Sequence, residues 1–255
     1  MLMAFTREVS PCIQRCQLTF MRRQAIDLKR AFHQHRTYVD KLRSLGVKVL
    51  SVPSTPWLPD AVFVEDTAVV LPELAIIAAP ARHTRRTEVC DVAQLLKLHR
   101  HVRFLEGPAT MEGGDIIHTD KHLFIGESLR TNKQGISQLR DIVSSFGYTA
   151  QSVRVSGCLH LSTGAAYIGR NTMLVNPAWI GVNAFKHYEA IVVSPDEPWA
   201  SNVLNIDGNI LMPDSFPHTR ARLERRGFTV EVIDISEFQK AEAGVTCMSL
   251  RFESQ

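Results

Sequence analysis

The chain has 255 residues, of which 45% are hydrophobic and 22% are charged, and its formal net charge at pH 7 is +3. This composition is typical of a globular protein with a sizeable core, and the length is long for one ordinary core and short for two domains. No apolar run approaches the roughly 20 residues of a membrane-spanning helix, so we expect no membrane association. The basic pairs are scattered along the chain, which argues against a nucleic-acid partner.

The first predicted elements are a strand, a long helix and a second strand. The strand covers residues 1–9, the amphipathic helix covers 22–46, and the second strand covers 47–53. Because no complete hairpin accompanies this helix and strand, the unit is incomplete at the N-terminal end of the chain.

Four predicted β-hairpins follow, and each consists of two apolar runs separated by a two-residue turn. The four turns are Pro72-Glu73, Asp120-Lys121, Arg170-Asn171 and Asp207-Gly208. The Asp-Gly turn is a strong hairpin signal. Since the hairpins recur along the chain, they indicate an internal repeat.

A helix and a strand are predicted after each hairpin, because apolar residues recur there at helical spacing. The helices cover 85–100, 132–147 and 217–227, with only a short, weak one over 183–190. The strands that follow them cover 101–107, 148–157, 191–194 and 228–235.

One more strand is predicted at the end of the chain, over residues 245–252. If this strand pairs with strand 1–9, the two termini complete a fifth unit. We therefore predict an α/β fold: a five-bladed α/β propeller of pseudo-fivefold ββαβ units, closed by pairing of the N- and C-terminal strands, in a single domain over residues 1–255. Closure removes exposed sheet edges. An open α/β sheet is the alternative, since alternating strands and helices alone favour it.

The cysteines indicate a reducing compartment. The N-terminus lacks the basic start and long apolar core of a secretory signal, so we expect free thiols and a cytoplasmic location. No second pair of cysteine or histidine residues stands near Cys12 and Cys16 at zinc spacing, so no metal site is expected. The five cysteines are Cys12, Cys16, Cys90, Cys158 and Cys247.

Three carboxylates crowd the otherwise apolar start of the first hairpin: Asp60, Glu65 and Asp66. Ionised carboxylates are rarely buried without a cationic partner. A structural salt bridge is one interpretation. A guanidinium-binding site is the other, because a carboxylate matches the planar fork of donors that a guanidinium presents.

Polar residues also stand at the starts of other units. Glu112 precedes two glycines that permit a tight turn or a close ligand, His160 lies between two leucines on a predicted strand, and Cys247 lies on the terminal strand. Taken singly, the histidine is more often structural and the cysteine more often a core thiol. In a ring, however, equivalent positions converge on the axis, so we expect these three residues to face Asp66. A thiolate, an acid/base and a carboxylate are the parts of a nucleophilic site, and the extra carboxylates indicate a cationic substrate.

Six motifs occur in order along the chain: LPDAVFVEDT, RRTE, MEGGDI, IGESLRTN, LHLSTG and GVTCMS. Together they resemble the dimethylarginine dimethylaminohydrolase family of the guanidine-modifying, or pentein, superfamily. The resemblance covers residues 18–252, and the ordered set is specific although each motif alone is weak. It implies a five-bladed α/β propeller. The compact chain favours this branch over the longer arginine deiminases and amidinotransferases.

The resemblance implies roles at the reacting end of the substrate. Cys247 would be the nucleophile, and His160 would be the general acid and base. Glu112 and Asp66 would hold the guanidinium nitrogens, with Glu65 close by.

The resemblance also implies roles at the amino-acid end of the substrate. Asp60 would bind the α-amino group, together with the backbone carbonyls of Leu18 and Ala241. Arg85 and Arg130 would hold the α-carboxylate.

Phe63 would line the slot beside the substrate chain.

The sequence departs from the family in two places. Residues 12–23 fall where the family has its substrate lid and match little beyond Leu18. Ser162 stands where relatives more often carry lysine. Both departures concern the exact substrate and remove no catalytic group.

The implied reaction is that of a dimethylargininase. Asymmetric dimethylarginine and monomethylarginine would be hydrolysed to citrulline and dimethylamine or methylamine, through a covalent thiouronium on Cys247, with no metal or organic cofactor. The partner would be a small guanidino molecule, and a homodimer is left open. Hydrolysis of arginine or citrulline is the alternative among enzymes, and a non-catalytic propeller scaffold is the alternative outside them.

Overall fold

The computed structural model describes residues 1–254, and the strands of this part of the chain form five sheets of three strands each. The sheet that holds both termini has the order β15 (Leu250–Glu253), β1 (Leu2–Thr6), β2 (Lys48–Ser51). The other four are β3 (Ala68–Val70), β4 (Leu74–Ile77), β5 (His101–Phe104); β6 (Ile116–Thr119), β7 (His122–Glu127), β8 (Thr149–Arg154); β9 (Ala165–Tyr167), β10 (Thr172–Val175), β11 (Glu189–Val192); and β12 (Leu204–Ile206), β13 (Asn209–Pro213), β14 (Thr229–Ile233).

Every sheet has the same topology. An antiparallel hairpin is followed by a helical connection and a third strand that pairs in parallel with the second strand of the hairpin. The terminal sheet repeats this pattern with strands from both ends of the chain: β15 is antiparallel to β1, with Leu2 opposite Glu253, and β1 is parallel to β2. The predicted closure by terminal strands is therefore confirmed.

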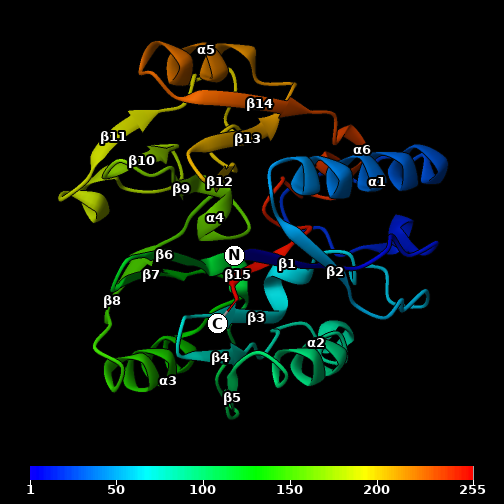
Figure 1. Ribbon diagram of the computed structural model, residues 1–255, viewed down its shortest axis with the longest axis vertical. Helices are drawn as coiled ribbons and strands as arrows, with labels where there is room; N and C mark the ends of the chain where they lie inside the picture. The colour runs from blue at the N-terminus through cyan, green and yellow to red at the C-terminus, as the bar shows by residue number, and fades with distance from the viewer. Residues whose placement is uncertain (255) are drawn as a thin grey trace.

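The four longer helices lie on the outside of the ring, and both chain ends lie near its middle (Figure 1). The outer helices are α1 (Leu28–Ser44), α2 (Val89–Leu96), α3 (Lys133–Ser144) and α5 (Pro217–Arg225). Two four-residue helices, α4 (Leu161–Gly164) and α6 (Ser236–Gln239), stand in connections. No helix within residues 1–254 is both long and apolar enough to cross a membrane.

Apolar side chains fill the space between each sheet and the next, so the core forms five clusters around the ring. One cluster contains Phe5 of the terminal sheet and Ala75 of the second sheet. Another contains Ala4 of the terminal sheet and Leu211 of the last sheet, and it closes the ring. Alternation along β1 sends neighbouring side chains into different clusters, because successive residues of a strand point to opposite faces.

Several predicted boundaries were wrong. The first helix begins at Leu28 instead of residue 22, because the Asp27 carboxylate accepts a hydrogen bond from Arg30 N and caps it. The weak helix predicted over 183–190 is a single turn of 3₁₀ helix, η5 (Val182–Phe185).

The residues predicted at the reacting end of the substrate lie in or next to turns, although Asp66, His160 and Cys247 were expected on strands. Asp66 lies in the 3₁₀ turn η2 (Val64–Thr67), and Glu112 directly precedes the 3₁₀ turn η4 (Gly113–Asp115). His160 directly precedes α4, and Cys247 lies in a turn before β15. Each of these turns leads into the first strand of a hairpin, which is why their side chains converge.

Candidate active site

The convergence brings His160 between two carboxylates. Its Nε2 lies 2.8 Å from Glu112 Oε2, and its Nδ1 lies 3.7 Å from Asp66 Oδ1. All three side chains are buried. Burial alone would lower the pKa of His160, but the charge of Asp66 and the hydrogen bond to Glu112 outweigh it and raise that pKa to about 9. His160 is therefore an imidazolium at neutral pH, which suits a proton donor.

Two glycines allow this close approach. A Cβ atom on Gly113 would lie 2.0 Å from the carbonyl oxygen of Glu65. A Cβ atom on Gly114 would lie 2.8 Å from both Asp66 Oδ1 and His160 Nδ1. Since these separations are far inside van der Waals contact, only glycine permits η4 to pack against η2 and the imidazole.

Asp115 ties three parts of the site together, a role that the sequence analysis missed. Its carboxylate accepts hydrogen bonds from Ser128 Oγ at 2.6 Å, Thr131 Oγ1 at 2.6 Å and Leu161 N at 3.0 Å. The first two residues flank Arg130, and the third follows His160. Burial raises the pKa of Asp115 to about 6. Asp115 belongs to the MEGGDI motif, which can be recognised in the sequence. The residues that donate hydrogen bonds to its carboxylate cannot be recognised there.

Arg85 is buried among carboxylates. Its Nη1 lies 2.7 Å from Asp66 Oδ2 and its Nη2 lies 2.8 Å from Glu88 Oε2. Nη2 also donates to the carbonyl oxygen of Phe63 at 3.2 Å. All three guanidinium nitrogens of Arg85 therefore have partners within the protein.

Arg130 pairs with the other carboxylate. Its Nη1 lies 3.2 Å from Glu112 Oε1, and its Nη2 donates to Thr19 Oγ1 at 3.5 Å. Its Nε is buried and has no hydrogen-bond partner within residues 1–254. In this structure both arginines contact the carboxylates that were expected to hold the substrate guanidinium, because buried carboxylates require cationic partners.

Cys247 is half-buried, and its backbone carbonyl oxygen accepts a hydrogen bond at 3.2 Å from the N–H of Glu65, which directly precedes Asp66. Gly244 N donates to Sγ at 3.4 Å. Burial raises the pKa of the Cys247 thiol well above its usual range, and the charges of Glu65 and Asp66 raise that pKa further. The free site therefore holds a neutral thiol, and a cation must bind nearby to favour the thiolate.

Asn202 fixes the turn that carries Cys247. Its Oδ1 accepts from Thr246 N at 3.1 Å, and its Nδ2 donates to Thr246 Oγ1 at 3.0 Å and to Ser162 O at 2.9 Å. Asn202 thus joins this turn to α4 beside His160. The sequence analysis missed it, since an asparagine in a loop carries no signal of partners some 40 residues away.

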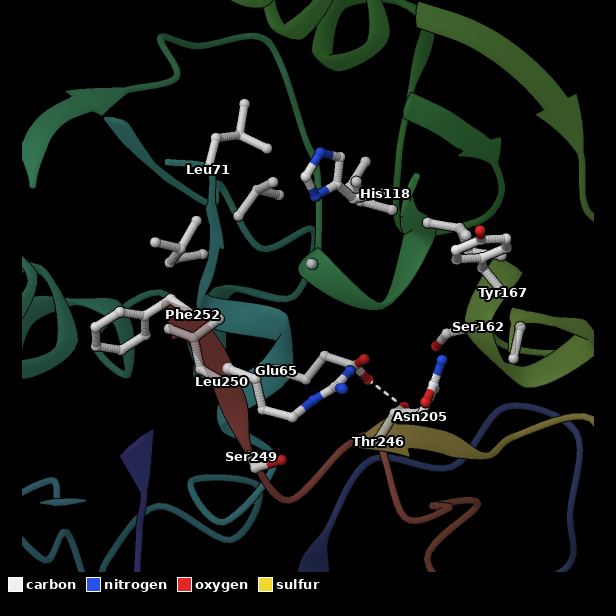
Figure 2. A pocket seen from close by; sticks show the side chains of 18 of the residues that line it. Glu65, Leu71, His118, Ser162, Tyr167, Asn205, Thr246, Ser249, Leu250 and Phe252 are labelled. Atoms are coloured by element: carbon white, nitrogen blue, oxygen red, sulfur yellow. Dashed lines mark hydrogen bonds between the residues drawn. The ribbon is translucent and has the colours of Figure 1, made fainter. Parts of the chain in front are cut away.

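A cavity of about 520 Å³ is lined in part by Glu65 and Thr246, the sequence neighbours of Asp66 and Cys247. Because residues from β3, β6, β9, β12 and β15 line it, we call it the axial cavity (Figure 2). Glu65 stands at its edge and accepts a hydrogen bond from Thr246 Oγ1 at 2.6 Å, drawn in Figure 2. Burial, together with the charge of Asp66, raises the pKa of Glu65 to about 7. Ser162 also lines the cavity, and its buried Oγ has no hydrogen-bond partner within residues 1–254.

Asp60, Leu18 and Ala241 were expected at the amino-acid end of the substrate. Asp60 Oδ1 accepts from Gln17 N at 2.9 Å, whereas the buried Oδ2 has no partner within residues 1–254. Leu18 and Cys247 both pack against an apolar cluster that contains Phe63 and Ala241. Because this buried carboxylate oxygen of Asp60 has no hydrogen-bond donor within residues 1–254, it is free to accept a hydrogen bond from an ammonium group of a ligand.

His160, Asp66 and Glu112 offer ligand atoms within 4.8 Å of one another, so they could in principle hold a metal ion. Arg85 and Arg130 contact these same carboxylates. Two guanidinium charges at this distance disfavour a divalent cation. A singly charged organic cation is repelled less strongly than a divalent ion and can donate hydrogen bonds to the carboxylates, so the cluster suits it better than a metal ion.

Known proteins are similar to this chain in sequence and in fold. The family model described as N,N dimethylarginine dimethylhydrolase, eukaryotic, matches residues 4–194. The N(G),N(G)-dimethylarginine dimethylaminohydrolase of Pseudomonas aeruginosa is 35% identical over 228 residues, which cover 89% of this chain and 90% of that protein.

Two solved structures are similar over nearly their whole length. One is the DDAH of Pseudomonas aeruginosa, a cysteine-to-serine variant complexed with citrulline, with a TM-score of 0.92 and 32% identity over 98% of each chain. The other is a dimethylarginine dimethylaminohydrolase, a histidine-to-glycine variant in an adduct with S-methyl-L-thiocitrulline. Its TM-score is 0.93 at 32% identity, over 98% of this chain and 99% of that one.

The fold and these relatives define a pentein hydrolase that acts on the C–N bonds of amidines. Within that class, the chain belongs to the dimethylarginine dimethylaminohydrolase family.

Proposed function

We propose that the protein hydrolyses asymmetric dimethylarginine and monomethylarginine to citrulline, with release of dimethylamine or methylamine. The observation that carries the proposal is the placement of His160 between Glu112 and Asp66, next to a turn in which the carbonyl oxygen of Cys247 accepts a hydrogen bond from Glu65 N at 3.2 Å. The citrulline complex and the S-methyl-L-thiocitrulline adduct of the two similar structures support the same substrate class.

The first step is binding of the guanidinium between Glu112 and Asp66. Carboxylates on its nitrogens fix its plane and keep it protonated. The bound cation also places a positive charge beside Cys247, which offsets the carboxylates that raise the pKa of the thiol. The thiol then loses its proton to solvent.

The second step is attack of the thiolate on the guanidinium carbon, which forms a C–S bond and a tetrahedral intermediate. Dimethylamine is too basic to leave as an anion, so His160 donates its proton to the departing nitrogen as the C–N bond breaks. A thiouronium remains on Cys247, and the imidazole is now neutral.

The third step releases the product. Neutral His160 takes a proton from water, and the oxygen adds to the thiouronium carbon. The C–S bond then breaks and the added oxygen loses its remaining proton to solvent, which yields citrulline, restores the thiolate and leaves His160 protonated. Glu112 accepts a hydrogen bond from the imidazole throughout and keeps it oriented.

The amino-acid end of the substrate is held by charge. We assign the α-ammonium to Asp60 and to the carbonyls of Leu18 and Ala241, because Asp60 Oδ2 has no other partner within residues 1–254. We assign the α-carboxylate to Arg85 and Arg130. Arg130 is expected to carry the larger share, since its Nε has no partner within the described chain whereas every nitrogen of Arg85 is engaged.

A substrate panel tests the proposal. Arginine, monomethylarginine, asymmetric and symmetric dimethylarginine, and citrulline are each assayed for citrulline, ammonia and amine, with Cys247→Ser as the inactive control. Equal amounts of citrulline and dimethylamine from asymmetric dimethylarginine are expected, with arginine much slower. Fastest turnover of arginine, or loss of the ureido group of citrulline, would assign the chain to another amidine substrate.

A further inference from the structure

A carboxylate outside the proposed mechanism binds the loop around Leu18, in which Gln17 N donates to Asp60 and Thr19 Oγ1 accepts from Arg130. Glu242 Oε1 accepts hydrogen bonds from Thr19 N at 2.9 Å, from Phe20 N at 2.5 Å and from Met21 N. Its Oε2 accepts from Thr19 N at 3.0 Å. Three successive backbone N–H groups thus converge on one carboxylate, an arrangement that stabilises an anion.

The position of Glu242 is unusual in two respects. Its side chain is buried, and it forms no ion pair with any residue between 1 and 254, so the loop amides are its charge-stabilising partners. Its φ is +60°, in the left-handed region that favours glycine and disfavours glutamate. A residue kept in a strained conformation suggests that its side chain has a function.

The hydrogen bonds of the loop fall on both sides of Leu18. Before Leu18, Gln17 N donates to Asp60 Oδ1 at 2.9 Å. After Leu18, Thr19, Phe20 and Met21 donate to Glu242. Glu242 also directly follows Ala241. The two carbonyl groups that we assign to the substrate α-ammonium are therefore held at a fixed separation by the side chain of Glu242.

We propose that Glu242 is a positioning residue that makes the site selective for free amino acids with an α-ammonium group. It ties the loop at residues 17–21 to the segment that leads to Cys247, and so presents the carbonyls of Leu18 and Ala241 to one cation. The proposal rests on the proposed function, because the ammonium is that of a methylarginine. Guanidines that lack the α-amino group gain nothing from this arrangement.

Glu242→Gly tests the role without straining the fold. Glycine suits a φ of +60°, so this change removes the carboxylate and relieves the backbone. Glu237→Gln is the matched control: Glu237 is also buried and also accepts a loop N–H, from Asp27 at 2.8 Å, but at the far end of the loop from Leu18.

Two substrates separate positioning from general damage: asymmetric dimethylarginine and its deamino analogue, 5-(N,N-dimethylguanidino)pentanoate. For Glu242→Gly we expect KM for the amino acid to rise about tenfold or more, because the α-ammonium loses a hydrogen bond to a carbonyl that Glu242 holds in place. We expect kcat to change by less than about threefold. KM for the deamino analogue should change by less than about threefold, and Glu237→Gln should leave both substrates unaffected. Equal increases in KM for both substrates, or no increase for either, would overturn the proposal.

Amide hydrogen exchange provides a readout that needs no turnover. The amides of residues 19–21 should exchange slowly in the parent and at least about tenfold faster in Glu242→Gly, because the hydrogen bonds that protect them are gone. Unchanged exchange would overturn the role of Glu242 whatever the activity. A parent protein that releases no citrulline but shows this difference would refute the proposed function alone.

Discussion

Replacing Glu65 by glutamine should stabilise the protein, and the gain should grow with pH. Burial, with the charge of Asp66, raises the pKa of the Glu65 carboxyl from 4.5 to about 7 in the folded state. Between these two values the folded protein binds more protons than the unfolded chain, so its stability falls as the pH rises. The contribution of Glu65 is fully present below pH 4.5 and is lost as the pH rises through 7.

The magnitude follows from the separation of the two pKa values. Each unit of pKa difference between the unfolded and folded states is worth about 1.4 kcal/mol of stability. The rise of the Glu65 pKa from 4.5 to about 7 therefore corresponds to a loss of about 3 kcal/mol when the carboxyl is ionised. Glu65 is half-buried at the edge of the axial cavity, where water screens its charge, so we expect about 1–3 kcal/mol. Glutamine is close in size, and its amide oxygen can still accept the hydrogen bond from Thr246.

The assay is urea unfolding of the parent and Glu65→Gln at pH 4.5 and pH 8. The difference in free energy of unfolding between the two proteins is compared across pH, because all other titrating groups then cancel. It should be about 1–3 kcal/mol larger at pH 8. The same change at exposed Glu106 should give a difference that is constant within about 0.5 kcal/mol. A constant difference for Glu65→Gln as well would refute the reasoning.

Three further outcomes are expected. Arg130→Ala should raise KM for asymmetric dimethylarginine about ten- to hundredfold, the value of a charge-assisted contact, and should do so far less for a descarboxy analogue; equal increases would contradict contact with the carboxylate. Asp115→Asn should lower kcat/KM at least about tenfold, because its carboxylate joins the segments that carry Arg130 and His160, and unchanged steady-state kinetics would show that the site does not depend on it. Alkylation of Cys247 by iodoacetamide at pH 8 should be severalfold faster in Glu65→Gln, because the charge of Glu65 raises the pKa of the thiol; exposed Cys90 should react equally in both proteins, and equal rates at Cys247 would argue against this coupling.

Sequence patterns were sufficient to predict the ring of five sheets, because each hairpin is encoded by neighbouring residues and the same pattern recurs along the chain. The turn at Asp207-Gly208 and the unpaired terminal strands required nothing beyond their own neighbourhoods, and both are confirmed by the pairing of β12 with β13 and of β1 with β15. Repetition also indicated that Asp66 and His160 would meet, since equivalent positions of a closed ring converge.

What the sequence did not show depends on contacts between distant segments. His160 was expected on a strand because leucines flank it, yet it precedes a helical turn that packs beside η4. Asn202 and Glu242 stand in loops, and their partners lie 40 or more residues away. A hydrogen bond of that kind leaves no periodicity in the sequence, so only the folded chain reveals it.

The central claim is that Cys247 attacks a guanidino carbon and that His160 is needed to free it again. Mass spectrometry of intact His160→Ala after incubation with S-methyl-L-thiocitrulline tests this most directly, because methanethiolate leaves without protonation. The account predicts one persistent adduct, which peptide mapping places on Cys247, with the other four cysteines unmodified at short times. An adduct that hydrolyses as fast in His160→Ala as in the parent, or labelling spread evenly over all five thiols, would contradict it.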